Sequence, residues 1–173
     1  MNVTTQKALN IVFIGCVRFS GTVLRQLIKS PSANIVGIVT KGSSSFNADF
    51  ASLENIATQA KIPCLSLEKF DPDEMAAWIA ARNPQVLFCI GWSHLLGKQI
   101  LNLAPLGVIG YHPAFLPLNR GRHPFIWALA LGLMKTGFTF LQRQIIPKLG
   151  INHFNDPKRV GPEPKGAKLH LME

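Results

Sequence analysis

His112 is the residue of this chain that is best placed to do chemistry. It follows an apolar stretch, residues 107–111, and precedes a loop rich in proline, asparagine, arginine and glycine. An apolar run bounded in this way predicts a buried strand followed by a loop. Ligands bind beyond the carboxyl ends of strands in open α/β sheets, and histidine exchanges protons near neutral pH. The alternative is a hydrogen-bonded core histidine, but the position at a strand end favours a site residue.

Apolar runs predict the strands that must position this residue. Four short runs, each bounded by turn residues, read as adjacent buried strands: residues 9–14, 35–40, 85–90 and 107–112. A shorter strand is predicted at 64–67 and a further one at 135–140. These segments are too short for core helices. We therefore expect one mainly parallel sheet.

Helical spacing of apolar residues separates these strands. Ser20 is expected to cap a first helix, and Asp71 caps another that opens with Pro72 and runs to residue 82. Residues 50–60 and 124–133 are predicted to be helical as well. Strands and helices that alternate in this way imply right-handed crossovers and helices on both faces of the sheet. The predicted fold class is α/β, doubly wound.

Size and composition indicate one globular domain. The chain has 173 residues, of which 47% are hydrophobic. No apolar run has the roughly 18 residues of a membrane span, and the first residues do not resemble a signal peptide. We expect a cytoplasmic protein without membrane contact. Cys16, Cys64 and Cys89 lack metal-ligand spacing and are interpreted as reduced core residues, so no metal site is predicted.

The formal net charge of +9 raises the alternative of a nucleic-acid-binding module. The basic residues are not concentrated in any one segment, which argues against a specific nucleic-acid partner. A more informative feature is the absence of any Asp or Glu between Glu74 and Asp156. That gap includes the whole region around His112.

The first predicted turn, residues 15–21, differs from a dinucleotide-binding loop. It reads Gly-Cys-Val-Arg-Phe-Ser-Gly, with Val17 where a Rossmann fingerprint needs its second glycine. That glycine lets the backbone approach a pyrophosphate. Nucleotide binding by this loop is therefore not expected.

Residues 107–132 resemble the signature of the formyltransferase superfamily. Gly110-Tyr-His112-Pro-Ala-Phe-Leu-Pro-Leu-Asn-Arg-Gly121 and the following Pro- and Trp-bearing helix are similar to its pattern, and the turn at residues 15–21 is similar to the one that opens these domains. Members include methionyl-tRNA, glycinamide ribonucleotide and sugar N-formyltransferases, which formylate an amine with 10-formyltetrahydrofolate. The resemblance implies a Rossmann-like domain, this co-substrate and a small-molecule amine acceptor, with an amino sugar favoured.

The resemblance also assigns roles to residues. Amine formylation needs a donor for a developing oxyanion and a group that moves protons, and His112 corresponds to the family histidine that serves this chemistry. The family Asn corresponds to Gly110, and the family Asp corresponds to the neighbourhood of Pro147. The residues implied for folate binding are Cys89, Gly91, Trp92, Leu95 and Leu96. Those implied for the acceptor are Asn119, Arg120 and Arg122.

The segment after Phe140 departs from the family pattern. We expect residues 1–140 to form an incomplete formyltransferase-like catalytic domain and residues 141–173 an irregular or disordered tail. Residues 142–149 can be encoded by codons that give Glu-Ala-Asp-Asn-Pro-Lys-Ile in another frame, which is similar to the missing family motif. The hypothesis is a frameshift near Phe140 that truncated the native domain. Weak or absent activity follows from it, so a catalytically inactive folate-binding or ligand-binding protein stays an alternative, and a homodimer stays open.

Overall fold

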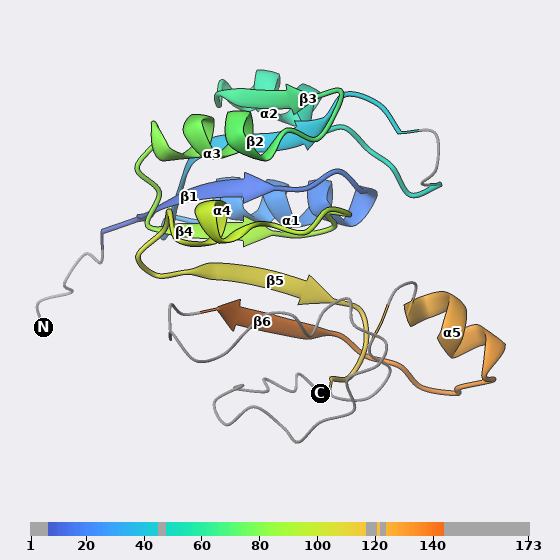
Figure 1. The fold of residues 1–173 in the computed structure, drawn as a ribbon. Coiled ribbons are helices and arrows are strands. Elements are labelled where there is room, and N and C mark those ends of the chain that lie inside the picture. Colours follow the sequence, from blue (N-terminus) through green and yellow to red (C-terminus); the bar gives the residue numbers. More distant parts are fainter. Residues whose placement is uncertain (1–6, 45–47, 117–120, 122–123, 144–173) are drawn as a thin grey trace, which may run out of the picture.

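A computed structural model of the chain describes residues 7–44, 48–116, 121 and 124–143. The described residues form a six-stranded sheet with the order β3-β2-β1-β4-β5-β6 (Figure 1). The strands are β1 (Leu9–Ile14), β2 (Ala33–Lys41), β3 (Cys64–Leu67), β4 (Val86–Cys89), β5 (Val108–His112) and β6 (Thr139–Arg143). Neighbouring strands from β3 to β5 are parallel, and β6 is antiparallel to β5. The predicted doubly wound, mainly parallel α/β fold is confirmed.

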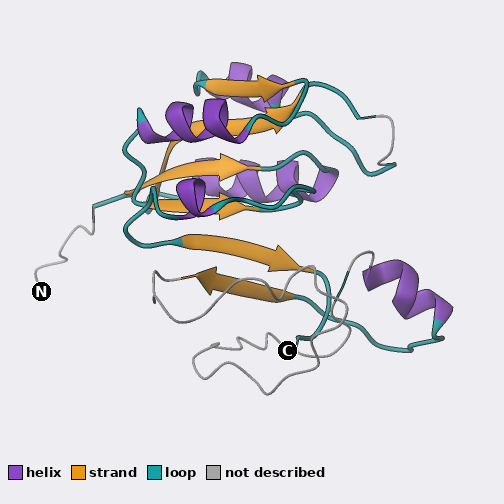
Figure 2. Cartoon of the chain, viewed as in Figure 1, coloured by secondary structure: helices purple, strands orange, loops and turns teal. Residues whose placement is uncertain are grey.

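Helices cover both faces of this sheet (Figure 2). They are α1 (Arg18–Lys29), α2 (Glu54–Ala60), α3 (Pro72–Ala80), α4 (Lys98–Leu101) and α5 (Pro124–Ala130). Buried side chains of α1 and α2 pack in one hydrophobic cluster, and those of α3 and α4 pack in another on the opposite face. In Figure 1, α5 stands apart from both layers, beyond the carboxyl end of β5.

The alternation of side chains along β1 divides the core between the two faces. Val12 and Ile14 pack with α3 and α4, whereas Ile11 and Phe13 pack with α1 and α2. Successive side chains of a strand point to opposite faces, so a strand between two helical layers is apolar throughout. This is why the sequence of β1 reads as a continuous apolar run.

The start of α1 differs from the prediction. Ser20 is not the N-cap, because the helix begins at Arg18 and Val17 occupies the cap position. The Ser20 hydroxyl accepts a hydrogen bond from the Val17 amide at 3.2 Å and donates one to the carbonyl of Ile90 at 2.6 Å. The Ser20 hydroxyl therefore satisfies the backbone amide at the start of α1 from within the first turn of the helix.

Other element ends also differ from the prediction. Residues 50–53 precede α2 instead of belonging to it, because the Ala51 amide donates to the Cys16 carbonyl and the Leu53 amide to the Thr40 hydroxyl. The predicted strand at 135–140 begins only at Thr139, where pairing with His112 starts, and it continues to Arg143. Helices α3 and α5 end before the predicted residues 82 and 133, and α4 was not predicted. The cap of α3 is confirmed, since the Asp71 carboxylate accepts from the amides of Asp73 and Glu74.

Candidate functional site

The order of the strands reverses between β1 and β4, and two turns meet at this point. The Ser20 hydroxyl donates to the carbonyl of Ile90 at 2.6 Å, and the Cys16 amide donates to the carbonyl of Gly91 at 3.2 Å. A Cβ atom on Gly15 would lie 2.4 Å from the Ile90 carbonyl oxygen. The β1–α1 turn is therefore fastened against the turn that follows β4.

Gly91 completes this contact. Its φ of +67° lies in the left-handed region, which side chains rarely adopt. A Cβ atom there would lie 2.2 Å from a methyl group of Val17. The β1–α1 turn thus packs directly against the backbone of the turn after β4. The same contacts fix the direction in which the chain leaves β4 toward Trp92.

The rings of Phe70, Trp92 and His94 lie together beyond the ends of β3 and β4, and the ammonium group of Lys41, at the end of β2, lies over the Trp92 ring. We call these four residues the aromatic cluster. The rings of Phe70 and His94 are stacked with centroids 4.5 Å apart, and Phe70 meets Trp92 edge-on at 6.2 Å. The Lys41 ammonium lies 6.0 Å from the centre of the Trp92 ring. The parallel strands β2, β3 and β4 end at the same edge of the sheet, and this brings the four residues together.

Two ring nitrogens of this cluster are buried without partners. Trp92 Nε1 and His94 Nε2 have no hydrogen-bond partner among the residues that the structure describes. Burial, and then the positive charge of Lys41, lower the pKa of His94. The neutral imidazole is therefore favoured. Buried polar atoms are normally paired, so unpaired ones at a strand end suit contact with a ligand.

The remaining residues predicted for the folate lie in the same segment. Cys89 and Leu96 pack against the core on the α3 and α4 face, and Leu95 is exposed. Burial, and then the neighbouring Cys16, raise the pKa of Cys89 to about 12. This thiol is therefore protonated at neutral pH, and any contact it makes with a ligand is an apolar one.

His112 lies at the carboxyl end of β5, as predicted, and is 8% exposed. Its partner across the antiparallel pair is Thr139 of β6. The Thr139 hydroxyl donates to the carbonyl of Ala114 at 2.8 Å and accepts from the amide of Leu116 at 3.1 Å. The first turn of the loop after His112 is therefore fastened to β6 by one buried side chain.

Gly110 leaves open space beside His112. Among the residues that the structure describes, a Cβ atom at this position would meet only the carbonyl oxygen of Leu141, at 3.9 Å. This is an ordinary van der Waals distance, so the backbone accommodates a side chain at the position that corresponds to the family Asn. The absence of that side chain is a property of the sequence and is not imposed by crowding.

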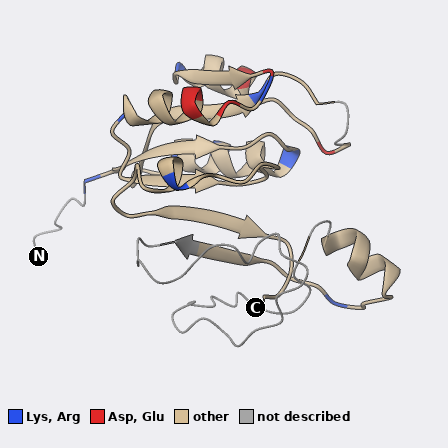
Figure 3. Cartoon of the chain, in the orientation of Figure 1, with Lys and Arg blue, Asp and Glu red and all other residues tan. Residues whose placement is uncertain are grey.

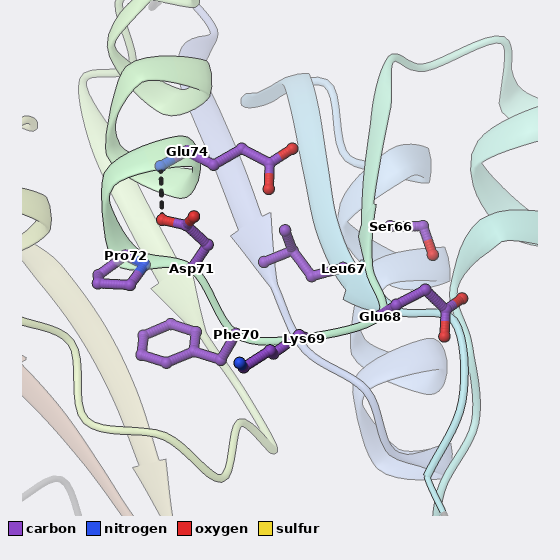
Figure 4. Close-up of a pocket in the computed structure, with 8 residues that line it drawn as sticks. All are labelled: Ser66, Leu67, Glu68, Lys69, Phe70, Asp71, Pro72 and Glu74. Carbon is purple, nitrogen blue, oxygen red and sulfur yellow. Dashed lines mark hydrogen bonds between the residues drawn. The ribbon is translucent and has the colours of Figure 1, made fainter.

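A cavity of about 540 Å³ lies at the carboxyl end of β3 and was not predicted. Figure 4 shows its lining, which is continuous in sequence from Ser66 to Pro72 and includes Glu74. The Asp71 carboxylate is occupied by the amide of Glu74, at 3.0 Å. Phe70 belongs both to this lining and to the aromatic cluster. The cavity therefore adjoins the predicted folate segment, at the same edge of the sheet.

Charges divide the described part of the molecule (Figure 3). The acidic residues that the structure describes all belong to segments up to Glu74, and β4, β5, β6 and α5 contain none. The described residues contain no group of three His, Cys, Asp or Glu that could hold a metal ion. His112 thus has no carboxylate near it in sequence within the described part.

Several predicted site residues cannot be placed. Asn119, Arg120 and Arg122 lie outside the described residues, as does the neighbourhood of Pro147. The predicted pocket that joins these acceptor residues to His112 and Trp92 stays a prediction. Lys41, Phe70 and His94 of the aromatic cluster were missed. No local motif links Lys41 and Phe70 to Trp92, because these positions are far apart in sequence, and His94 was given no functional role.

The fold defines an α/β protein whose candidate site lies beyond the carboxyl ends of β4 and β5. Residues 9–144 match the family model described as Formyl transferase. The chain belongs to the formyltransferase family.

Curated relatives agree with this assignment. The chain is 31% identical over 135 residues to a methionyl-tRNA formyltransferase of Thermotoga neapolitana, a match that covers 76% of this chain and 43% of the relative. A methionyl-tRNA formyltransferase of Desulfotalea psychrophila is 34% identical over 142 residues, with 79% and 43% covered. The chain thus spans less than half the length of these relatives.

Solved structures share the fold. A phosphoribosylglycinamide formyltransferase from Anaplasma phagocytophilum has a TM-score of 0.64 and 20% identity, with 80% of this chain and 66% of that chain covered. A formyltetrahydrofolate deformylase from Pseudomonas syringae has a TM-score of 0.63 and 17% identity, with 81% and 47% covered. Within the described residues, no helix is long and apolar enough to cross a membrane.

Proposed function

We propose that this chain carries the site of a 10-formyltetrahydrofolate-dependent formyltransferase that acts on an amine, and that its own activity is weak or absent. The observation that carries the proposal is the position of His112. This residue ends β5, the strand beside β4, whose following turn holds Trp92. A proton carrier and an aromatic segment therefore lie at one edge of the sheet of a formyltransferase-family protein.

The segment after β4 suits a folate. A pteridine is a flat heteroaromatic ring system with hydrogen-bonding nitrogens and a carbonyl oxygen. The aromatic cluster offers ring faces, and Trp92 Nε1 and His94 Nε2 are buried without partners among the described residues. Cys89, Gly91, Trp92, Leu95 and Leu96 would line the folate, which supplies the formyl group.

His112 would transfer protons during the reaction. An attacking amine must lose a proton when it is formylated, and the departing nitrogen must gain one. Imidazole exchanges protons at neutral pH, and a buried imidazolium also stabilises a developing oxyanion. The antiparallel pairing with Thr139 holds the backbone of His112 in place. Such positioning is a large part of catalysis by preorganised groups.

Two features predict a loss of rate. Gly110 provides no side chain at the position that corresponds to the family Asn, and no Asp or Glu occurs between Glu74 and Asp156. Each loss of about 1.36 kcal/mol of transition-state stabilisation lowers the rate tenfold. Two missing groups would therefore reduce turnover by several orders of magnitude. Folate binding depends on other residues and would persist.

The acceptor is proposed to be an amine on a small, sugar-linked molecule. Arg120 and Arg122 follow His112 closely in sequence and suit an anionic group such as a phosphate. The matched relatives are named for methionyl-tRNA and for phosphoribosylglycinamide. Both names describe an amine linked to a phosphate-bearing molecule, and they enlarge the set of acceptors to be tested beyond amino sugars.

A formyl-transfer assay tests the proposal. The chain, its His112→Ala variant and a version encoded in the restored frame after Phe140 are incubated with 10-formyltetrahydrofolate. The acceptor panel holds free and nucleotide-linked amino sugars, glycinamide ribonucleotide and methionyl-tRNA. We expect little product from the chain itself and recovery by the restored version.

Other outcomes separate the alternatives. Robust turnover by the 173-residue chain that His112→Ala abolishes would show that the carboxylate is dispensable. Calorimetric folate binding without transfer by either version would favour the inactive binding protein. Binding of tRNA that vanishes at moderate salt, without folate binding, would favour non-specific phosphate contact instead.

A further inference from the structure

The largest group of exposed apolar side chains among the described residues lies on α5 and the segment that follows it. Six of these side chains, which we call the α5 surface, are between 54% and 96% exposed: Phe125, Ile126, Trp127, Leu129, Leu131 and Met134. A fully exposed apolar side chain of this size presents about 200 Å², so the six together present on the order of 800 Å². The largest apolar patch of an ordinary monomer covers about 300–600 Å². The α5 surface therefore has the size of a contact site.

Apolar side chains are exposed around most of the circumference of α5. Phe125, Ile126 and Trp127 are consecutive and all exposed, and successive residues of an α-helix point about 100° apart. Ala128 is the only buried residue of this helix. Figure 1 shows the reason, since α5 lies beyond the carboxyl end of β5 and apart from both helical layers. A partner that covers these side chains must therefore contact more than one side of the helix.

The segment that carries the α5 surface is nearly uncharged. Residues 124–140 contain one charged residue, Lys135, and α5 itself contains none (Figure 3). Binding to an anionic membrane commonly uses a cluster of about four to eight Lys or Arg residues, and a helix that lies on a membrane buries one apolar face. The centre of a homodimer interface, in contrast, is apolar and depleted of charged residues. Charge and exposure therefore favour a protein partner over a lipid surface.

We propose that two copies of this chain associate through the α5 surface. Each partner of a standard protein interface contributes about 800 Å², which is the area that the α5 surface presents. Twofold symmetry brings the same patch of each copy together. Two protruding helices can then pack side by side, and each covers more than one side of the other. The second copy would lie at the edge of the sheet where β5 ends at His112.

Sedimentation velocity at increasing protein concentration tests the proposal. We expect a dimer, and Leu129→Asp should raise its dissociation constant by at least about tenfold, because a carboxylate replaces an apolar contact. Met134→Asp should act in the same direction. The matched control is Leu106→Asp, since this leucine is also exposed but precedes β5, at the opposite end of the strand from α5. Its dissociation constant should equal that of the unmodified chain.

Two outcomes of this experiment would overturn the proposal. The first is a chain that stays monomeric at every concentration that can be reached. The second is a dimer that Leu106→Asp weakens as much as Leu129→Asp does, since the interface would then not be specific to α5. Circular dichroism confirms that each variant is folded.

Tryptophan emission locates the interface. Trp127 is 59% exposed in the single chain, so dimer formation should shift its emission to shorter wavelength as the protein concentration rises. Trp127→Phe should remove this shift, because Trp78 and Trp92 already pack against the core. A dimer that forms without the shift would place the interface elsewhere and contradict the proposal. Co-sedimentation with phosphatidylglycerol vesicles by a chain that is monomeric in solution would also contradict it, since a lipid surface would then be the partner.

Discussion

The strands β1 and β2 and the strands β5 and β6 belong to one sheet, yet their side chains lie in different surroundings. Phe13 of β1 is fully buried between β2, β4 and the helices of one face, whereas Phe140 of β6 keeps 43% of its surface exposed. Helix α5 differs similarly from α1, because only Ala128 of α5 is buried and Leu129 is 82% exposed. Among the residues that the structure describes, the strands of the first half are buried on both faces, whereas Phe140 of β6 and most of α5 are exposed.

Truncating one phenylalanine in each half of the domain should give the largest difference in stability between the two halves. Phe13→Ala removes a fully buried ring and should lower the free energy of unfolding by about 4 kcal/mol. Phe140→Ala removes a ring with one exposed side and should cost about 1 kcal/mol. Chemical denaturation followed by circular dichroism measures both. Equal losses would mean that β6 is as well packed as β1.

The contact between the β1–α1 turn and the end of β4 should tolerate little change. Gly15→Ala places a Cβ atom 2.4 Å from the carbonyl oxygen of Ile90. This oxygen belongs to the backbone, so it cannot move aside as the end of a flexible side chain could. We expect a loss of about 3 kcal/mol from overpacking. The control is Gly97→Ala, whose new Cβ atom would meet Gln99 only at 4.0 Å. Comparable stability of the two variants would show that the turns separate easily.

Thr139 should contribute more to the stability of the fold than the size of its side chain suggests. Thr139→Val keeps the shape but leaves the Ala114 carbonyl and the Leu116 amide without the hydroxyl that now bonds both. A loss of about 2 kcal/mol is expected for two unsatisfied backbone groups. In Thr22→Val, an exposed hydroxyl with a 3.4 Å contact is removed, and the change should stay within about 0.5 kcal/mol. Urea midpoints measure the difference, and equal midpoints would contradict the role of Thr139.

The smallest expected effect is the change in the pH dependence of stability when His94 is replaced. Burial and Lys41 lower the pKa of His94 below its usual 6.5, so the folded state binds this proton less readily than the unfolded state does. The stability associated with neutral His94 is present above pH 6.5 and decreases as the pH falls through the folded pKa. His94→Gln should therefore weaken the decline in stability between pH 7.5 and 5.5. An unchanged pH dependence would mean that His94 titrates as in the unfolded chain.

Local patterns predicted the sheet well. Continuous apolar runs identified the strands because β1, β2 and β4 are buried on both faces, and Asp71 with Pro72 identified the start of α3. The start of α1 was predicted wrongly because the Ser20 hydroxyl serves a partner in the turn after β4, 70 residues away in sequence. The strand predicted at residues 135–140 was misplaced, because the extent of β6 is set by its pairing with His112 and Val108. No local signal reports either contact.

The candidate site shows the same limit. His112 could be placed at a strand end because the apolar run and the following loop are contiguous in sequence. The aromatic cluster could not be predicted, because Lys41, Phe70 and Trp92 meet only through the lateral order of β2, β3 and β4. The cavity beside Phe70 depends on the same order. Residues that follow different strands become neighbours only when the order of the strands is known.

Folate binding by the segment after β4 is best tested by calorimetric titration with 10-formyltetrahydrofolate. The chain should bind it, and Trp92→Leu should weaken binding by at least about tenfold, which corresponds to about 1.4 kcal/mol. Trp127→Leu is the matched control, because this exposed tryptophan lies on α5, which stands apart from the sheet beyond the carboxyl end of β5 (Figure 1), and its loss should leave the affinity unchanged. Absence of binding by the unmodified chain, or equal affinity of Trp92→Leu, would contradict the proposed folate site.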